Sequence, residues 1–270
     1  MTNDYLIVAK GTEKLGDHVA VSRFLERWMS LSDVQFRPEK YDFGEPLRRS
    51  LTLETLPDAV SEWMKSGRAF MFGRTKKPKY LVDVQWRRDQ GLDNRMFPWG
   101  CSIWLDRAVG DANAEMLFRL LIECVDPVFA YATTEDDERA KHFVRIKDRV
   151  GTIEKYVGLE IEHQLPGVYW RTYFGSWAID LLGGIEPFND LTCPVVKLDG
   201  GRVVRPFEAS EDANCGTSIS AEAALYAALG EQHFFSLSQF QASSIKVDDV
   251  TADAIEKAVA ATKQSSAPHG

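Results

Sequence analysis

The sequence predicts an α+β protein in which helices pack against a mostly antiparallel β-sheet. Three observations predict this class. Residues 80–86 show a two-residue period, which is the pattern of a strand in a sheet with one solvated face. Residues 111–124 carry apolar side chains at helical spacing. Residues 168–174 are rich in aromatic and β-branched side chains, which fit the pleated, half-buried surface of a strand.

Length and composition are those of a globular protein with one domain. The chain has 270 residues, of which 44% are hydrophobic and 27% are charged. It can therefore bury a sizeable core without disulfides or metal ions. No change of composition divides the chain, so we expect a single domain over residues 1–263. Residues 264–270 have the composition of a disordered tail.

The net charge restricts the class of partner. A formal net charge of −8 disfavours nonspecific attraction to nucleic acid or anionic lipid, and it suits a partner with a basic surface. The first residues show no basic segment followed by an apolar core, and no apolar run has the length of a membrane span. We therefore expect a cytoplasmic protein that binds neither nucleic acid nor membrane directly. These features do not determine the oligomeric state.

The first third of the chain contains two predicted strands and two predicted helices. Residues 5–9 form an opening strand, and residues 35–43 form an irregular one. Asp17 caps a helix that ends near residue 29 and turns Val19, Phe24, Leu25 and Trp28 inward. A second helix covers residues 56–65, with a proline in its first turn, where proline is tolerated.

The rest of the chain mixes both kinds of element. The predictions, in order, are a hairpin of residues 69–72 and 80–86, a strand 101–105, a helix from 111 to 127, a second helix from 128 to 141, a polar surface loop 145–163, a hairpin of 193–198 and 202–205, and helices over 220–229 and 248–263. Glycines in the turn after Asp199 favour the later hairpin.

The stretch 165–182 combines several local signals. Pro166-Gly167 forms a turn before a strand of aromatic and β-branched residues, and Gly175 ends that strand. Ser176 is expected to cap a short helix over residues 177–182. The aromatic side chains are interpreted as core residues, with exposed binding anchors as the alternative.

No recognised catalytic motif is present. The sequence has no G-x-S-x-G segment, no Walker-type phosphate loop and no G-x-G-x-x-G, and its four cysteines form no C-x-x-C pair. Glu138 and His142 lie four residues apart and would share one face of a helix, either as two metal ligands or as part of a solvated ion-pair face. Glu160, Glu162 and His163 are interpreted as surface residues, or alternatively as the centre of a hydrolase-like enzyme.

Two charged clusters have a structural and a functional interpretation. The basic residues Arg74, Lys76, Lys77 and Lys79 lie on a hairpin connection, where such side chains guard a sheet edge or form a nucleic-acid patch. The acidic run Glu135, Asp136, Asp137 and Glu138 is either a solvated face or a contact for a basic partner, in which case complementary charge would speed association.

The stretch 165–175 resembles the L-P-G-x-Y-W-x-x-Y/F-F-G segment of bacterial immunity proteins from polymorphic-toxin and type VI secretion systems, and is most similar to the immunity protein 52 family. The matching residues, which we interpret as structural, are Pro166, Gly167, Tyr169, Trp170, Tyr173, Phe174 and Gly175. The strands 80–86 and 101–105 and the helix 114–124 are compatible with the family. The resemblance covers about residues 60–190.

The resemblance implies a protein that binds and neutralises a cognate toxin, such as a nuclease, before the toxin harms the producing cell or its kin. Inhibition would be non-catalytic and would need no cofactor or metal. We take Glu135, Asp136, Asp137 and Glu138 as the predicted toxin contacts. The alternatives are an enzyme of unrecognised, hydrolase-like class and a structural or scaffold component of a secretion apparatus.

Overall fold

A computed structural model of the chain describes residues 4–12, 14–66, 69–86, 99–147, 152–162 and 164–241. Contacts divide the chain into two units, Met1–Phe235 and Ser236–Gly270, and the fold described below belongs to the first. The predicted helix 248–263 and the predicted tail 264–270 lie outside the described residues.

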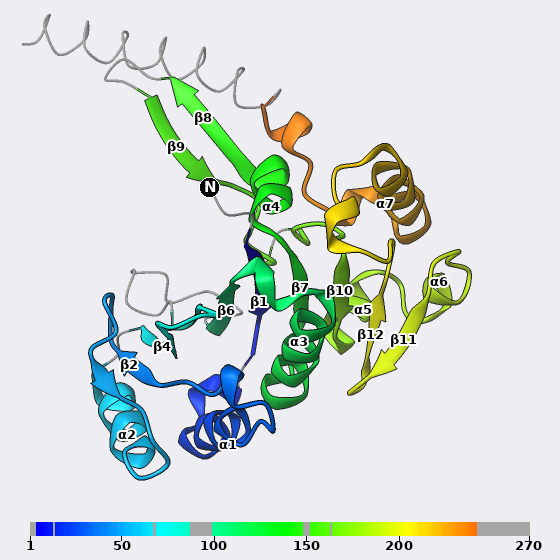
Figure 1. Ribbon diagram of the computed structural model, residues 1–270. Coiled ribbons are helices and arrows are strands. Elements are labelled where there is room, and N and C mark those ends of the chain that lie inside the picture. Colours follow the sequence, from blue (N-terminus) through cyan, green and yellow to red (C-terminus); the bar gives the residue numbers. More distant parts are fainter. Residues whose placement is uncertain are drawn as a thin grey trace, which may run out of the picture. The chain divides into compact units, whose positions relative to one another are not determined.

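A ten-stranded sheet forms the centre of this unit, and every pairing within it is antiparallel (Figure 1). The strand order is β11-β12-β10-β7-β1-β6-β5-β4-β2-β3. The strands are β1 (Tyr5–Lys10), β2 (Lys40–Asp42), β3 (Arg49–Ser50), β4 (Phe70–Arg74), β5 (Tyr80–Trp86), β6 (Trp99–Leu105), β7 (Phe129–Thr134), β10 (Arg171–Phe174), β11 (Val195–Leu198) and β12 (Gly201–Val204). The predicted α+β class is confirmed.

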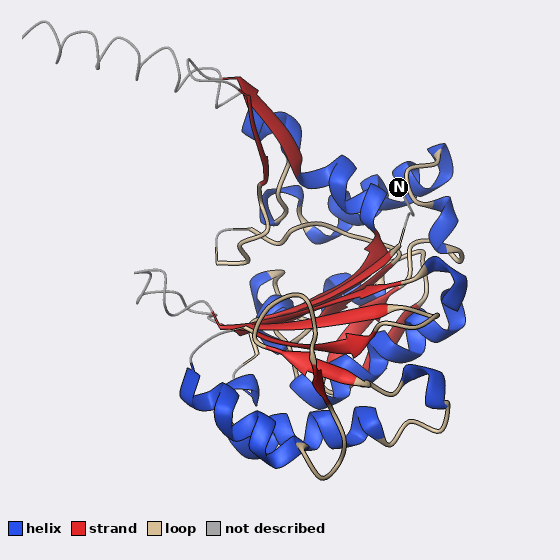
Figure 2. Cartoon of the chain, turned by 60° about the vertical axis from the view of Figure 1, so that its left-hand side comes forward, coloured by secondary structure: helices blue, strands red, loops and turns tan. Residues whose placement is uncertain are grey.

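Helices cover both faces of the sheet (Figure 2). The helices are α1 (His18–Met29), α2 (Leu56–Ser66), α3 (Asp111–Val125), α4 (Glu135–His142), α5 (Ser176–Leu181), α6 (Glu186–Asn189) and α7 (Gly216–Leu229). One core lies between the sheet and α1, α2 and α3. A second core lies on the opposite face, beneath α5, α6 and α7. The sheet therefore buries apolar side chains on both faces.

The central strand β1 shows how the two cores are divided. Tyr5, Ile7 and Ala9 belong to the first core, whereas Leu6 and Val8 belong to the second. Successive side chains of a strand point to opposite faces, so a strand covered on both faces becomes a continuous apolar run. This is why residues 5–9 show no alternation in the sequence.

The helix predicted over residues 128–141 is wrong in its first half. Phe129–Thr134 form β7, which pairs with β1 and β10, and only Glu135–His142 form a helix, α4. All six residues of β7 are buried. A short apolar run that is covered on both sides has no period that distinguishes a strand from a helix.

The surface loop predicted over residues 145–163 is also wrong in its first part. β8 (Phe143–Lys147) and β9 (Thr152–Tyr156) form a separate two-stranded sheet. Arg145 and Glu154 lie opposite each other and pair at 2.7 Å, and the rings of Phe143 and Tyr156 meet edge to face. Cross-strand pairs of this kind stabilise a polar hairpin that has little core of its own.

Two local predictions differ in their outcome. Asp17 caps α1 as predicted, since its side chain accepts a hydrogen bond from the Val19 amide at 3.1 Å. The Val19 side chain, predicted to face inward, is 51% exposed, and Val21 is buried instead. The buried stripe of α1 therefore begins at Val21, three residues after the first helical residue, His18.

The cap predicted at Ser176 is wrong. Gly175 occupies the N-cap position of α5 and makes no side-chain hydrogen bond, while Ser176 is already helical. A Cβ atom on Gly175 would lie 2.5 Å from the Pro127 carbonyl oxygen, which is closer than Cβ atoms come to other atoms in proteins. The Gly175 amide also donates to the Val128 carbonyl at 3.0 Å. Close approach of the chain that leads into β7 therefore requires glycine here.

Candidate functional site

The motif residues 165–175 lie inside the protein. Pro166, Gly167, Tyr169, Trp170, Tyr173, Phe174 and Gly175 are all buried. Only residues 171–174 are strand, β10, and residues 166–169 before them are neither helix nor strand. The aromatic side chains are thus core residues rather than exposed anchors.

The motif contributes to both cores. Trp170 and Tyr173 belong to the core beneath α3, and Tyr169 and Phe174 belong to the opposite one. Tyr169 stacks on Tyr131 of β7 with ring centroids 4.1 Å apart. Aromatic rings supply a large buried area, so this segment links the two helical layers through the sheet.

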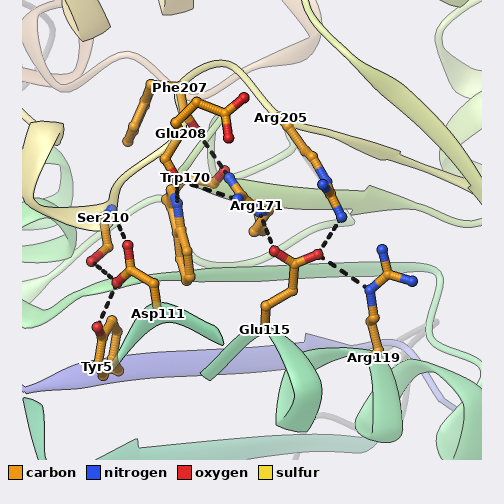
Figure 3. Close-up of polar contacts among 10 residues, drawn as sticks. All are labelled: Tyr5, Asp111, Glu115, Arg119, Trp170, Arg171, Arg205, Phe207, Glu208 and Ser210. Carbon is orange, nitrogen blue, oxygen red and sulfur yellow. Dashed lines mark hydrogen bonds and ion pairs between the residues drawn. The ribbon is translucent and has the colours of Figure 1, made fainter. Parts of the chain in front are cut away.

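Arg171 is the one charged residue of the motif strand, and it is buried (Figure 3). Its Nε donates to Glu115 Oε2 of α3 at 3.1 Å. Its Nη1 donates to the carbonyl oxygens of Trp170 and Phe207, each at 2.9 Å, and its Nη2 donates to that of Glu208 at 3.2 Å. All three guanidinium nitrogens are engaged, so Arg171 joins β10, α3 and the segment after β12.

Glu115 is the acceptor at the centre of this network. Besides Arg171 it pairs with Arg205 and, at 3.2 Å, with Arg119 one helical turn away (Figure 3). Burial by itself would raise the pKa of Glu115, but Arg171 and Arg205 hold it below its usual value. The carboxylate is therefore ionised at neutral pH and shared among three cations.

Asp111, one helical turn before Glu115 at the start of α3, binds the segment that follows β12. It accepts hydrogen bonds from Tyr5 Oη and Ser210 Oγ, both at 2.5 Å, and from the Ser210 amide at 3.0 Å (Figure 3). Burial raises the pKa of Tyr5 to about 12, so the phenol stays protonated and donates. Together, Asp111 and Glu115 fasten residues 205–210 onto α3.

A hollow of about 690 Å³ adjoins this network between α1 and α3. Its lining combines an apolar floor with charged residues, namely Leu31, Ala112, Met116, Leu120, Arg27, Glu115, Arg119 and Glu123, together with two serines. Arg27 pairs with Glu123, and Arg119 pairs with Glu115. The charges around this hollow therefore neutralise one another.

The acidic run on α4 divides into an outer and an inner pair. Asp136 is exposed and Glu135 is partly exposed. Asp137 is fully buried and accepts a hydrogen bond from Thr133 Oγ1 at 2.5 Å. Glu138 is also buried and accepts a hydrogen bond from Tyr131 Oη at 2.5 Å. Of the four predicted contacts, the structure brings only Glu135 and Asp136 to the surface.

Lys141 completes this cluster beneath α4. Its Nζ lies 3.1 Å from Asp137 Oδ1, 2.9 Å from Glu222 Oε1 of α7 and 2.8 Å from the Val168 carbonyl oxygen. Burial lowers the pKa of Lys141, but Asp137 and Glu222 more than offset this, so the amine stays charged. One cation does not compensate two buried carboxylates, and burial raises the pKa of Glu222 to about 7.

His142 and Glu138 do not act as a pair. His142 Nε2 lies 2.5 Å from Tyr169 Oη and Nδ1 lies 2.7 Å from the Val157 carbonyl oxygen, while Glu138 bonds to Tyr131. Burial lowers the pKa of His142 to about 4, so the ring is neutral. In the part of the chain that the structure describes, no group of three or more His, Cys, Asp or Glu residues could hold a metal ion.

The residues of the hydrolase-like alternative do not line the hollow between α1 and α3. Glu160 is exposed, Glu162 is partly exposed, and neither belongs to the lining of that hollow. His163 lies outside the described residues. On the hairpin connection, Lys76, Lys77 and Lys79 are exposed, and Arg74 pairs with Glu39 at 3.7 Å.

Sequence reasoning missed the two buried ionic networks. The position of Arg171 indicated a buried ion pair, because an arginine within a buried aromatic strand needs a charged or polar partner. Its partner Glu115 lies 56 residues away on α3, so no local pattern identifies it. Lys141 and Glu222 are 81 residues apart and meet only because the fold brings α4 next to α7.

Comparison with known proteins yields a likeness in fold. No protein-family model matches the sequence, and no curated protein matches it. The structure is similar to that of the Pseudomonas aeruginosa T6SS protein PA0821, with a TM-score of 0.54 and 13% sequence identity. The likeness covers 86% of this chain and 73% of that one. At this identity it establishes a shared fold. Within the described residues, no helix has both the length and the apolar composition needed to cross a membrane.

Proposed function

We propose that this chain is an immunity protein of a type VI secretion system, which binds a cognate toxin in the cytoplasm and inhibits it without catalysis. The observation that carries the proposal is the fold, shared over 86% of the chain with a type VI secretion system protein of Pseudomonas aeruginosa. The buried motif 165–175, which resembles that of bacterial immunity proteins, agrees with it.

The placement of the ionisable groups supports a binding role. Perturbed pKa values often mark catalytic groups, but buried ion-pair networks perturb them too. Here the groups with shifted pKa values, His142 and Glu222 among them, contact other parts of the fold. Arg171 and Glu115 likewise join elements of the fold. Contacts of this kind between elements suit a protein that presents a fixed surface to a partner.

The outer pair of α4 is the proposed contact for a basic toxin surface. Glu135 and Asp136 lie in the first turn of α4, with Arg139 and Ala140 exposed one turn later. The inner pair, Asp137 and Glu138, contributes to the stability of this helix rather than to contact with the toxin. Complementary charge at such a surface mainly raises the rate of association.

Expression of the neighbouring open reading frame tests the function itself. We expect its product to arrest growth, co-expression of this chain to restore growth, and affinity purification of this chain to recover a one-to-one complex. A harmless neighbour that does not bind this chain would contradict the proposal. Recovery of a self-assembled or multi-component particle instead of a one-to-one complex would favour a scaffold role in the same apparatus.

Charge reversal tests the proposed contact. The double variant Glu135→Lys, Asp136→Lys should associate with the toxin about tenfold more slowly at low salt, and its rate should depend less on salt. Stopped-flow mixing across a range of salt concentrations measures both effects. The matched control is Glu54→Lys, Asp58→Lys, which changes the net charge equally at two exposed positions at and before the start of α2. Equal rates for both double variants would exclude α4 as the contact.

A further inference from the structure

A second hollow, of about 380 Å³, lies beside the hairpin of β11 and β12. Figure 1 shows α6 next to β11 at this end of the sheet. The lining residues are Phe188, Asn189, Leu191, Cys193, Val195, Lys197 and Arg202. Two of them are cations, and none is an acid. The lining residues therefore contribute positive charge and no negative charge.

The two cations are neighbours across the hairpin. Lys197 and Arg202 are directly opposite in the register of β11 and β12, so their side chains leave the same face of the sheet. Like charges directly opposite each other are destabilising. Among the described residues neither forms an ion pair, and Arg202 Nη1 donates only to the carbonyl oxygen of the adjacent Gly201 at 3.0 Å. The pair is thus an unfavourable arrangement in the free protein.

The surrounding sequence makes this pair unexpected. Residues 176–235 contain nine Asp or Glu and only three Lys or Arg. The third cation, Arg205, is engaged by Glu115. Both remaining cations of an acidic segment therefore line one hollow, although many carboxylates lie nearby in the chain.

Protection of the sheet edge explains only one of the two. Lysine on an edge strand discourages pairing with another chain, and β11 is the terminal strand of the sheet. This accounts for Lys197. Arg202 lies on β12, which is paired on both sides, with β11 and β10. Protection of the sheet edge therefore does not account for Arg202.

We propose that this hollow is an anion-binding pocket in which Lys197 and Arg202 hold the phosphate or carboxylate group of a small ligand. Guanidinium groups bind such oxygens with two parallel hydrogen bonds, and the ammonium adds a point charge. Asn189 offers an amide donor at the same hollow. Burial raises the pKa of the Cys193 thiol, so the sulfur adds no negative charge at neutral pH. This inference does not depend on the proposed function.

Titration with two anions tests the pocket. Inorganic phosphate and acetate are added separately to the intact protein at constant ionic strength, and the amide signals of Lys197 and Arg202 are followed by NMR. We expect a saturable shift at both positions. Saturation by phosphate alone assigns a phosphate ligand, saturation by acetate alone assigns a carboxylate ligand, and saturation by both supports the shared chemistry.

Substitutions locate the binding. Lys197→Gln and Arg202→Gln should each weaken binding about tenfold, since each removes a charge-assisted hydrogen bond. The matched control, Lys76→Gln, removes the same charge from an exposed position elsewhere and should bind as the unmodified protein does. The spectra themselves report whether each variant is folded. Absence of saturable shifts with both anions, or equal binding by the double variant Lys197→Gln, Arg202→Gln, would overturn the proposal.

Discussion

Replacing Arg171 by methionine is expected to lower the free energy of unfolding by about 3–5 kcal/mol. The guanidinium donates to the Glu115 carboxylate and to three backbone carbonyl oxygens, and its side chain is 4% exposed. Methionine fills the space of the stem but donates nothing, so three carbonyl groups lose their partner. Each buried group left unsatisfied costs about 1–3 kcal/mol. Urea denaturation followed by tryptophan fluorescence measures the loss.

Arg119 provides a control on the same carboxylate. It pairs with Glu115 one helical turn away, but its side chain is 38% exposed. Arg119→Met should therefore cost only about 0.5 kcal/mol. If the two variants lost the same stability, the contacts of Arg171 to the carbonyl oxygens of residues 207 and 208 would not be the stabilising feature that we infer.

The second large effect is expected at Lys141. Lys141→Met leaves the carboxylates of Asp137 and Glu222 without their common cation. Removing one partner of a buried ion pair costs about 3–5 kcal/mol, because the remaining charge is uncompensated. Lys155→Met is the matched control, since Lys155 is exposed on β9 and its replacement should change stability by less than about 0.5 kcal/mol.

The loss at Lys141 should depend on pH through Glu222. The folded pKa of Glu222, about 7, lies above its usual value of 4.5, so the folded protein holds the proton between these values. The stability that this proton contributes is full below pH 4.5 and is lost as the pH rises through about 7. His142, with a pKa of about 4, stays neutral in the folded state over most of this range.

Denaturation at two pH values measures this dependence. The Lys141→Met variant should lose about 2 kcal/mol less at about pH 5.5, where Glu222 is protonated, than at about pH 8, above the folded pKa of Glu222. Adding Glu222→Gln to the variant should remove the difference between the two pH values. An equal loss at both pH values in the single variant would show that Glu222 does not carry the charge assigned to it.

The local pattern of the sequence was sufficient where neighbouring residues decide the structure. The cap at Asp17, the helix α3 and the hairpin turn after Asp199 depend on contacts within a few residues, so the sequence predicts them. The burial of Tyr169, Trp170, Tyr173 and Phe174 was also predicted, because large aromatic rings in a strand are rarely exposed together.

The candidate site could be predicted only in part. The acidic run was identified, but the sequence does not tell that Asp137 and Glu138 turn inward while Glu135 and Asp136 turn outward. That division follows from the direction in which α4 leaves β7, and β7 was itself predicted as a helix. An error in one element thus displaced the interpretation of the next.

The sequence by itself determined the class of the fold, most of its helices and hairpins, and the burial of the motif 165–175. Only the tertiary structure decided that 129–134 is a central strand, that Arg171 meets Glu115, and that Lys197 and Arg202 line one hollow. The physical reason is the distance along the chain over which each kind of interaction acts. Periodicity, capping and turn chemistry act within a few residues of the chain, whereas burial on both faces and the pairing of distant charges exist only once the sheet has brought separate segments together.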